Sequence, residues 1–417
     1  MKVLLISAFP PSKHNLGVPS ALPYYLTKYP PPNFQIDLIY YEGFEKMEYL
    51  FKEDLNNIFK KVTKISKTPG YIYYPLRLIQ KLNIFKNLSG TSLKHIPGVK
   101  QLKEIEALNY DLIWIYPHTL YSWNRKFKQC RVVVTGPDCS SLHYELMSKI
   151  YSKGSIEFQG PMLENYHVRN LLDLKNNAYQ VDKRWSNSTA LIHVVGEDDR
   201  KMYEKLGAGN HCFYCRHPYF DYSDVINDIS NINGKLTVLI TGVNHSIYIG
   251  NYLDRIIQLI VINQHLSKYY KFSFLGNGFE NNQEKLSAAG YETSLCTWTN
   301  KYNDFISKAN VQLFPIVLGT GTKGKVLSAL VSGLLCIGTK YAFENIHINN
   351  QTDCILIDND MDVIFALERI INEKNDYSAM AKRGAQNVLF EHSPQETAKD
   401  FWEHLIKYYK ESKKESQ

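Results

Sequence analysis

The sequence has no apolar run that approaches the roughly 20 residues needed to span a lipid bilayer. The apolar stretch at residues 3–7 is short and is soon followed by Pro10 and Pro11, so it predicts a buried strand and not a signal peptide. A hydrophobic fraction of 44% with a charged fraction of 21% is typical of a globular protein and excludes an intrinsically disordered one. We therefore expect a cytoplasmic protein.

Cysteine is also scarce, with seven residues scattered along the chain. Cys212 and Cys215 are the one close pair, and no second pair or set of histidines follows at zinc-finger spacing. An odd number of scattered cysteines predicts free thiols in a reducing compartment. We expect neither disulfides nor a metal site.

Acidic residues are missing altogether from residues 55–103, a segment that holds ten lysines and arginines. Aromatic and aliphatic residues are interleaved with these charges, and such a mixture is typical of a surface that contacts anionic lipid headgroups. A helical insertion with solvated charges is the alternative. Nucleic acid is not expected as a partner, because no recognition motif accompanies the charge. We favour peripheral contact with an anionic membrane.

A chain of 417 residues is too long for one ordinary hydrophobic core, so two domains are expected. Short apolar runs alternate with helical patterns in both halves, which predicts two doubly wound α/β domains. We place the first domain at residues 1–220, with the basic segment 45–103 as an insertion, and the second at 234–390. Ser393 and Pro394 favour a helix start, so residues 391–417 are predicted to form a helix to Tyr409 and a frayed tail.

Residues 311–339 carry the pattern with the clearest chemical meaning. An apolar run ends in a glycine-rich turn that contains Lys323 and Lys325, and an apolar helical pattern follows from Val326. Amide groups and the dipole at a helix N-terminus favour an anion, and Lys323 adds a full positive charge. The turn is therefore predicted to bind a phosphate or a diphosphate.

This turn resembles the donor-site signature of GT-B glycosyltransferases, in particular retaining enzymes of family 4 with the pattern G-x-G-T-[RK]-x-K-[IV]-L-E-A. The matching residues are Gly319, Gly321, Thr322, Lys323, Lys325, Val326, Leu327 and Ala329. Residues 236–242, 272–278 and 298–309 resemble other parts of the family's donor domain in the right order, so the likeness covers residues 234 to about 346. It implies a GT-B fold, in which two Rossmann-like domains face each other across a cleft and a C-terminal helix crosses back to the first domain.

The resemblance also implies which residues bind the donor. These are Gly17, Gly242, Asn251, Trp298, Gly319, Thr320, Gly321, Thr322, Lys323, Lys325, Ser328 and Glu344. Lys323 would stabilise the charge of the leaving diphosphate, and Glu344 would lie near the sugar hydroxyls. Three alternatives stay open: Gly17 only starts a helix, Lys325 lies on a helix surface, and Trp298 packs in the core.

In the first domain the resemblance points to His118 and Asp138, each of which follows a predicted strand, as catalytic residues on the acceptor side. A histidine that orients a sugar and a carboxylate near the acceptor hydroxyl are groups that such a reaction requires. The alternatives are that His118 satisfies a turn and that Asp138 caps the helix expected to begin near Ser140.

The sequence departs from the family at two places. Ser328 stands where members have a ribose-binding glutamate, and Asn244 and His245 occupy a stretch where many members carry Arg and Lys. The implied activity is hexosyl transfer from a UDP- or GDP-sugar, with retention and without an essential metal or cofactor. The acceptor would be a saccharide or a lipid-linked glycan in bacterial surface polysaccharide biosynthesis. A catalytically degenerate subunit that scaffolds a partner enzyme and a nucleotide-sugar epimerase are the alternatives.

Overall fold

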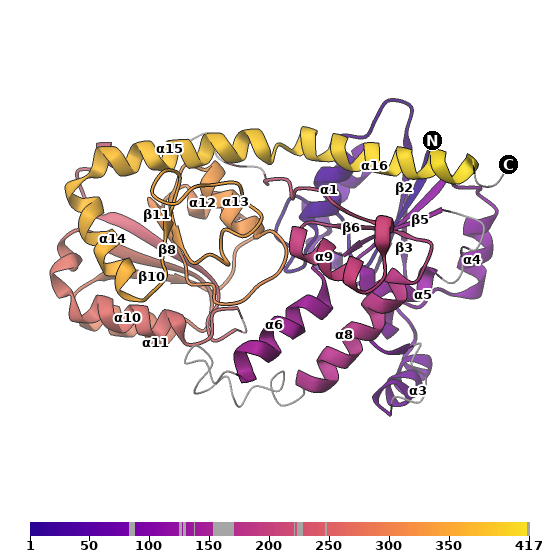
Figure 1. Ribbon diagram of the computed structural model, residues 1–417, viewed down its shortest axis with the longest axis horizontal. Helices are drawn as coiled ribbons and strands as arrows, with labels where there is room; N and C mark the ends of the chain where they lie inside the picture. Colours follow the sequence, from indigo (N-terminus) through magenta and orange to yellow (C-terminus); the bar gives the residue numbers. More distant parts are fainter. Residues whose placement is uncertain are drawn as a thin grey trace. The chain divides into compact units, whose positions relative to one another are not determined.

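The structure is a computed structural model that describes the chain except for residues 83–87, 125–126, 128–130, 137, 153–170, 221, 223–227, 247 and 415–417. The chain forms two compact units (Figure 1). The first unit comprises Met1–Glu145, Leu171–Pro218 and Pro394–Gln417, and the second comprises Leu146–Asn170 and Tyr219–Ser393. Each unit is built around one parallel sheet, as the alternation of strand and helix patterns predicted.

The sheet of the first unit has seven strands in the order β3-β2-β1-β4-β5-β6-β7. They are β1 (Lys2–Ser7), β2 (Gln35–Tyr41), β3 (Lys61–Ile65), β4 (Leu112–Tyr116), β5 (Arg131–Gly136), β6 (Leu191–Val194) and β7 (Cys212–Tyr214). Every residue of β4 is buried, because helices cover both faces of a parallel sheet of this kind.

Strand β3 lies inside the segment that the sequence predicted to be an insertion. It pairs in parallel with β2, with Lys61 opposite Asp37 and Ile65 opposite Tyr41. The β-branched residues of this stretch favour a strand, and its two exposed lysines suit a sheet edge, where charge discourages further pairing. The basic segment therefore supplies one edge of the sheet as well as helices.

The helices of the first unit are α1 (Ala21–Lys28), α2 (Lys52–Ile58), α3 (Gly70–Lys81), α4 (Val99–Glu106), α5 (Tyr121–Asn124), α8 (Leu171–Ser186), α9 (Glu197–Lys205) and the C-terminal α16 (Pro394–Lys414). Helix α6 (Ser140–Ser152) begins in the first unit, and its residues from Leu146 onward are assigned to the second. No described helix is both long and apolar enough to cross a bilayer.

Helix α16 packs against α1 and the sheet of the first unit. Phe401, Trp402 and Leu405 are fully buried, and each such side chain contributes roughly 2 kcal/mol relative to an exposed one. The indole of Trp402 donates a hydrogen bond of 2.8 Å to the carbonyl of Leu26 in α1. The predicted return of the last helix to the first unit is confirmed, although the helix runs to Lys414 and does not fray at Tyr409.

The sheet of the second unit has six strands in the order β10-β9-β8-β11-β12-β13. They are β8 (Leu236–Val243), β9 (Tyr270–Asn277), β10 (Glu292–Cys296), β11 (Val311–Phe314), β12 (Leu335–Gly338) and β13 (Ile355–Leu356). Helices α10 (Tyr252–Ile262) and α11 (Glu280–Ala288) cover one face, whereas α13 (Gly324–Val331) and α15 (Lys374–Glu391) cover the other (Figure 1). The remaining helices are α12 (Tyr302–Ile306) and α14 (Met361–Asn372).

Candidate functional site

The strand order of the second unit creates a switch point between β8 and β11. These two strands are neighbours in the sheet, yet the helices that follow them, α10 and α13, lie on opposite faces. Ligands of open α/β sheets bind beyond the carboxyl ends of the strands at such a point, because the two following loops diverge there. A hydrogen bond of 2.8 Å from the amide of Val317 to the carbonyl of Tyr248 joins the two loops. The candidate site is therefore formed by the loops after β8 and β11.

Two glycines allow β8 and β9 to approach each other closely at this end of the sheet. Gly242 and Gly276 are register partners, and both have φ of +132°. A Cβ atom on Gly276 would lie only 1.6 Å from the carbonyl oxygen of Gly242, so no other residue fits at position 276. Gly242 was predicted to bind the donor, and the structure gives it a backbone role at the edge of the site.

The turn before α13 has the backbone form that its glycines suggested. Gly321 has φ of +65°, a conformation that glycine adopts readily. A Cβ atom on Gly319 would lie 2.8 Å from Cε of Lys323, so glycine at this position leaves space for the lysine to fold back over the turn. Lys323 is the N-cap of α13, and its own side chain makes no capping hydrogen bond to this helix. The first backbone hydrogen bond of the helix runs from the amide of Val326 to the carbonyl of Lys323 over 2.9 Å. The amides of Gly324 and Lys325 precede this bond, and amides at a helix N-terminus suit an anionic ligand.

Lys323 and Glu344, both predicted donor-site residues, form an ion pair. Nζ of Lys323 lies 2.6 Å from Oε2 of Glu344 and also donates a 2.9 Å hydrogen bond to the carbonyl of Gly321. Their side chains are 13% and 24% exposed, so the pair is partly shielded from solvent. Asn345 donates to the same Gly321 carbonyl over 3.2 Å and fixes the turn further. The ammonium is thus held over the turn with its charge balanced by one carboxylate.

Other predicted residues of the signature lie around this pair. Thr320 and Thr322 are buried, whereas Lys325 is exposed, although the protein atoms around its ammonium lower its pKa by desolvation. Ser328 is 1% exposed, and its hydroxyl donates a 3.0 Å hydrogen bond to the carbonyl of Gly324 within the helix. Its hydroxyl proton is therefore occupied by the helix, and only its lone pairs are left to accept a bond from a ribose.

The loop after β8 collects buried polar atoms that have no hydrogen-bond partner among the described residues. These atoms are Oδ1 of Asn244, Nδ1 of His245 and Oδ1 of Asn251. His245 adopts a left-handed backbone with φ of +53°, and its Nε2 lies 3.4 Å from Oδ2 of Asp254. Buried polar atoms without partners are rare in native structures, so their concentration in this loop indicates a place for a polar ligand. The sequence predicts that Asn251 binds the donor. For His245 it indicates only that this stretch lacks the Arg and Lys that many family members carry.

Trp298 lies in the loop after β10, and its side chain is 53% exposed. The alternative that Trp298 packs in the core is therefore wrong, because a core side chain would be buried and about half of this one is exposed. Contact with a nucleobase stays a prediction.

In the first unit, His118 lies immediately after β4 and is 5% exposed. Its Nε2 lies 3.0 Å from Oγ of Ser140 and 3.7 Å from Oδ1 of Asp182, while Nδ1 has no partner among the described residues. Burial lowers the pKa of His118, and the nearby Asp182 only partly opposes this shift. His118 is consequently a neutral imidazole near neutral pH, able to accept a hydrogen bond at one nitrogen.

Asp138 is exposed in the loop after β5. The amide of Ser141 donates to Asp182 over 2.7 Å, and the amide of Cys139 donates to Asp199 over 2.7 Å. The acceptor role of Asp138 and its capping alternative both stay predictions. Sequence reasoning missed Asp182 and Asp199, because both lie on helices more than 40 residues downstream of the loop.

Gly17 lies in the exposed loop between β1 and α1. It has φ of +73°, and its amide donates a 3.0 Å hydrogen bond to the side chain of Asn15. This left-handed conformation explains the glycine at this position, and its contact with a donor stays a prediction.

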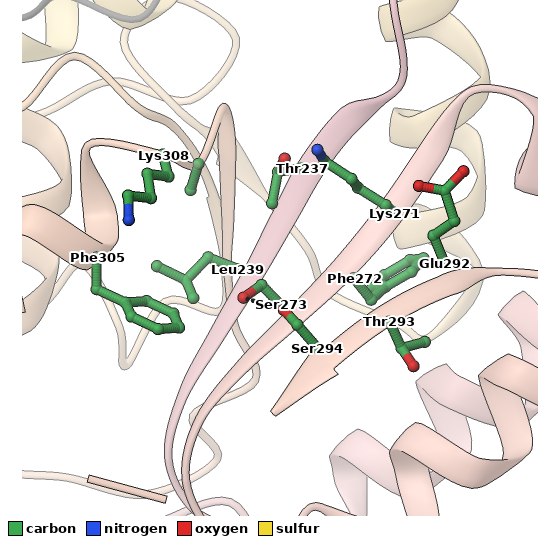
Figure 2. A pocket seen from close by; sticks show the side chains of 11 residues that line it. Thr237, Leu239, Lys271, Phe272, Ser273, Glu292, Thr293, Ser294, Phe305 and Lys308 are labelled. Carbon is green, nitrogen blue, oxygen red and sulfur yellow. Dashed lines mark hydrogen bonds between the residues drawn. The ribbon is translucent and has the colours of Figure 1, made fainter. Parts of the chain in front are cut away.

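The second unit also has a cavity of about 330 Å³ that is separate from the glycine-rich turn. Figure 2 shows that it opens on the sheet surface, where Ser273 of β9 and Ser294 of β10 lie side by side, 2.9 Å apart between their hydroxyls. Lys271 and Lys308 lie at its edges. Its lining comes from the middle and the amino halves of the strands, so it is not the site that the switch point predicts.

The described residues contain no cluster of three or more histidine, cysteine, aspartate or glutamate side chains that could hold a metal ion. The described cysteines are free thiols, as predicted, whereas Cys130 lies outside the described residues.

No protein-family model matches the sequence, and no curated protein matches it. The structure, however, is similar to HepE of Anabaena in complex with UDP and glucose, with a TM-score of 0.62, 12% sequence identity, and coverage of 98% of this chain and 100% of that chain. It is similar to sucrose-phosphate synthase of Thermosynechococcus elongatus, with a TM-score of 0.63, 10% identity, and coverage of 98% and 99%. TarM of S. aureus in complex with UDP gives a TM-score of 0.62, 9% identity, and coverage of 98% and 99%. The chain has the GT-B fold of glycosyltransferases, as predicted.

Proposed function

We propose that this chain is a glycosyltransferase that moves a sugar from a UDP- or GDP-sugar to a saccharide or lipid-linked glycan, with retention of the anomeric configuration. The observation that carries the proposal is the position of Lys323. Its ammonium lies over a glycine-rich turn at the start of α13, beside the switch point of a GT-B sheet. The complexes of HepE and TarM with UDP support a uridine nucleotide as the donor base.

The roles of the residues follow from where negative charge develops. Cleavage of the bond between the anomeric carbon and the diphosphate leaves charge on the phosphate oxygens, and a fixed cation stabilises the transition state more than the ground state. Lys323 supplies this cation, and the amides at the start of α13 add hydrogen bonds. Glu344 is displaced from the ammonium by the diphosphate and turns to the sugar hydroxyls. No metal ion is required for these roles.

We place the acceptor chemistry at His118 and Asp138 in the first unit. A neutral His118 can accept or donate a hydrogen bond to a sugar hydroxyl, and the exposed Asp138 can take a proton from the acceptor. A glycan carried on a lipid at the inner face of the cytoplasmic membrane, as in bacterial surface polysaccharide assembly, is the acceptor class that we favour.

A catalytically degenerate subunit is the second candidate, and one observation favours it. The hydroxyl of Ser328 is turned to the Gly324 carbonyl, and a serine cannot make the two charge-assisted bonds that a glutamate makes to a ribose. Such a subunit would bind a nucleotide without turning over its sugar in the absence of a partner enzyme.

A nucleotide screen separates these functions. Thermal denaturation is measured with UDP, GDP, CDP and ADP, and the nucleotide that raises the melting temperature is then tested as its sugar conjugates for donor hydrolysis and transfer. We expect stabilisation by UDP or GDP and release of the free nucleotide from its sugar conjugate. Stabilisation without turnover would favour the degenerate subunit, epimer formation without acceptor would favour an epimerase, and stabilisation by none of the four would contradict the donor site.

A further inference from the structure

Helix α3 carries an apolar face that no described part of the chain covers. No residue of this helix is buried. Tyr71, Tyr74, Leu78 and Leu82, which is the C-cap, are 79%, 67%, 59% and 61% exposed. Successive members of this set are three or four residues apart, so all of them lie on one face of the helix. Single exposed apolar residues are common on protein surfaces, whereas a continuous apolar helix face marks a contact surface.

The opposite face of α3 fixes how the helix is presented. The side chain of Gln80 donates a 3.1 Å hydrogen bond to the carbonyl of Thr91. Just before the helix, the amide of Thr68 donates over 2.9 Å to the carbonyl of Lys94, whose ammonium lies 6.0 Å from the ring centre of Tyr73. Figure 1 shows α3 at the periphery of the first unit, away from the strands. The apolar face is thus held toward the outside.

The charged residues of α3 are all basic. Arg77 and Lys81 lie on the helix and are exposed, and the chain before it carries Lys60, Lys61, Lys64 and Lys67. Residues 55–103 contain no acidic residue. Among the described residues, Lys64 pairs over 3.7 Å with Glu45, which lies outside this segment. Two copies of such a surface would repel each other, whereas an anionic surface would attract it.

We propose that α3 is an interfacial helix that docks the protein on an anionic lipid surface. Tyr71, Tyr74, Leu78 and Leu82 enter the boundary between headgroups and acyl chains, and Arg77 and Lys81 contact the headgroups. Tyrosine suits this boundary because its ring is apolar and its hydroxyl reaches water. The inference is independent of the donor chemistry, and it would place the acceptor-binding unit at the surface where a lipid-linked glycan is found.

The proposal sets a scale for the effect of each charge. A basic residue near an anionic membrane strengthens partitioning by roughly five-fold. Replacing Arg77 and Lys81 together with glutamine is therefore expected to weaken binding to anionic vesicles by about 25-fold, and added salt should weaken wild-type binding in the same direction. Replacing Tyr74, Leu78 and Leu82 with serine should reduce binding to the level seen with neutral vesicles.

The test is co-sedimentation of the full chain with vesicles of phosphatidylcholine, with and without phosphatidylglycerol. Wild type should sediment with the mixed vesicles only, and the two sets of α3 variants should remain in solution. Phe390→Ser with Ile262→Ser is the matched apolar control, because these side chains are 79% and 75% exposed on α15 and α10. Lys399→Gln with Lys407→Gln is the matched charge control on α16. Both controls should bind the mixed vesicles as wild type does.

Three results would overturn the proposal. The first is that wild type fails to bind mixed vesicles, and the second is that the α3 variants bind them as well as wild type does. The third is that no protein binds vesicles, while sedimentation velocity shows a dimer for wild type and a monomer for the α3 variants. Circular dichroism and thermal shift with UDP, measured on each variant, show that the fold and the donor site are intact. If wild type does not bind UDP, the proposed function is contradicted, whereas the result with vesicles still tests the role of α3.

Discussion

At the residue scale, the account depends on the position of one ammonium group. Lys323 reaches over a turn whose glycines permit its approach, and it is balanced by Glu344 from the loop after β12. A partly buried cation with a single balancing carboxylate is ready to exchange that carboxylate for a diphosphate, because both are anionic acceptors of charge-assisted hydrogen bonds.

Lys323→Ala should lower turnover by at least about ten-fold, because removing one preorganised charge contact commonly costs 10²–10³ in rate. Donor turnover at saturating nucleotide-sugar is the measurement. Lys268→Ala is the control, since Lys268 is an exposed lysine of the same unit far along the chain from the turn. Unchanged turnover in Lys323→Ala would remove the phosphate role from this residue.

Ser328→Glu should tighten UDP binding, because a carboxylate can make charge-assisted bonds to the two ribose hydroxyls where serine offers one neutral acceptor. Isothermal titration calorimetry with UDP checks this. Ser328→Gln has the same size without the charge and should gain less. Equal affinities for wild type and Ser328→Glu would mean that the ribose is held by other residues.

The sequence predicted Lys323 and Glu344 as site residues, but it did not predict the side chains that reach the site loops from distant helices. Lys323 and Glu344 could be proposed because each stands in a local pattern beside a strand end. The contact of His245 with Asp254, and that of Asp182 of α8 with the start of α6, could not be proposed, because these contacts depend on how distant helices pack. The chemistry of a loop is visible in sequence, whereas the side chains that reach it from elsewhere are not.

At the element scale, the central strands were predictable because a strand buried on both faces is a continuous apolar run. The edge strands β3 and β7 were not, because an edge position tolerates lysine in β3 and leaves β7 only three residues long. The docking of α16 on the first unit was predicted. The ring contact between Phe401 of α16 and His193 of β6 was not predicted. His193 is fully buried, with its ring centre 4.8 Å from that of Phe401 and 5.1 Å from that of Phe213.

This packing makes the first unit sensitive to acid. Burial lowers the pKa of His193 to about 3, against about 6.5 in an unfolded chain. Between these values the unfolded state binds a proton that the folded state refuses, so stability is complete above about pH 6.5 and falls as the pH decreases. At about pH 5 the loss is on the order of 2 kcal/mol.

His193→Phe should remove this part of the pH dependence. Urea denaturation of both proteins, at neutral pH and at about pH 5, gives the difference in free energy of unfolding, and groups shared by the two proteins cancel. When the pH is lowered, the free energy of unfolding should fall less for His193→Phe than for wild type. Parallel pH curves would contradict the buried neutral imidazole.

At the scale of the whole molecule, the groups to which we assign donor and acceptor roles lie in different units. The second unit holds the glycine-rich turn, the start of α13 and the buried polar atoms of the loop after β8. The first unit holds His118, Asp138 and the basic, apolar-faced α3. The net charge of +7 is unevenly distributed along the chain, because residues 55–103 carry ten lysines and arginines and no acidic residue.

Hydrogen exchange should report this division. UDP is expected to slow amide exchange in residues 242–251 and 319–324 of the second unit, because a bound nucleotide covers both loops of the switch point. In the first unit only the loop around Gly17 should respond, and β6 and α9 serve as internal controls. Protection confined to the first unit would place the nucleotide elsewhere.

The central claim is tested most directly by a crystal structure of the protein with UDP. The account predicts that the diphosphate oxygens lie within hydrogen-bond distance of Nζ of Lys323 and of the amides at the start of α13, with Glu344 released from the lysine. A nucleotide bound elsewhere, for example in the cavity of Figure 2, with the Lys323–Glu344 pair intact, would contradict it.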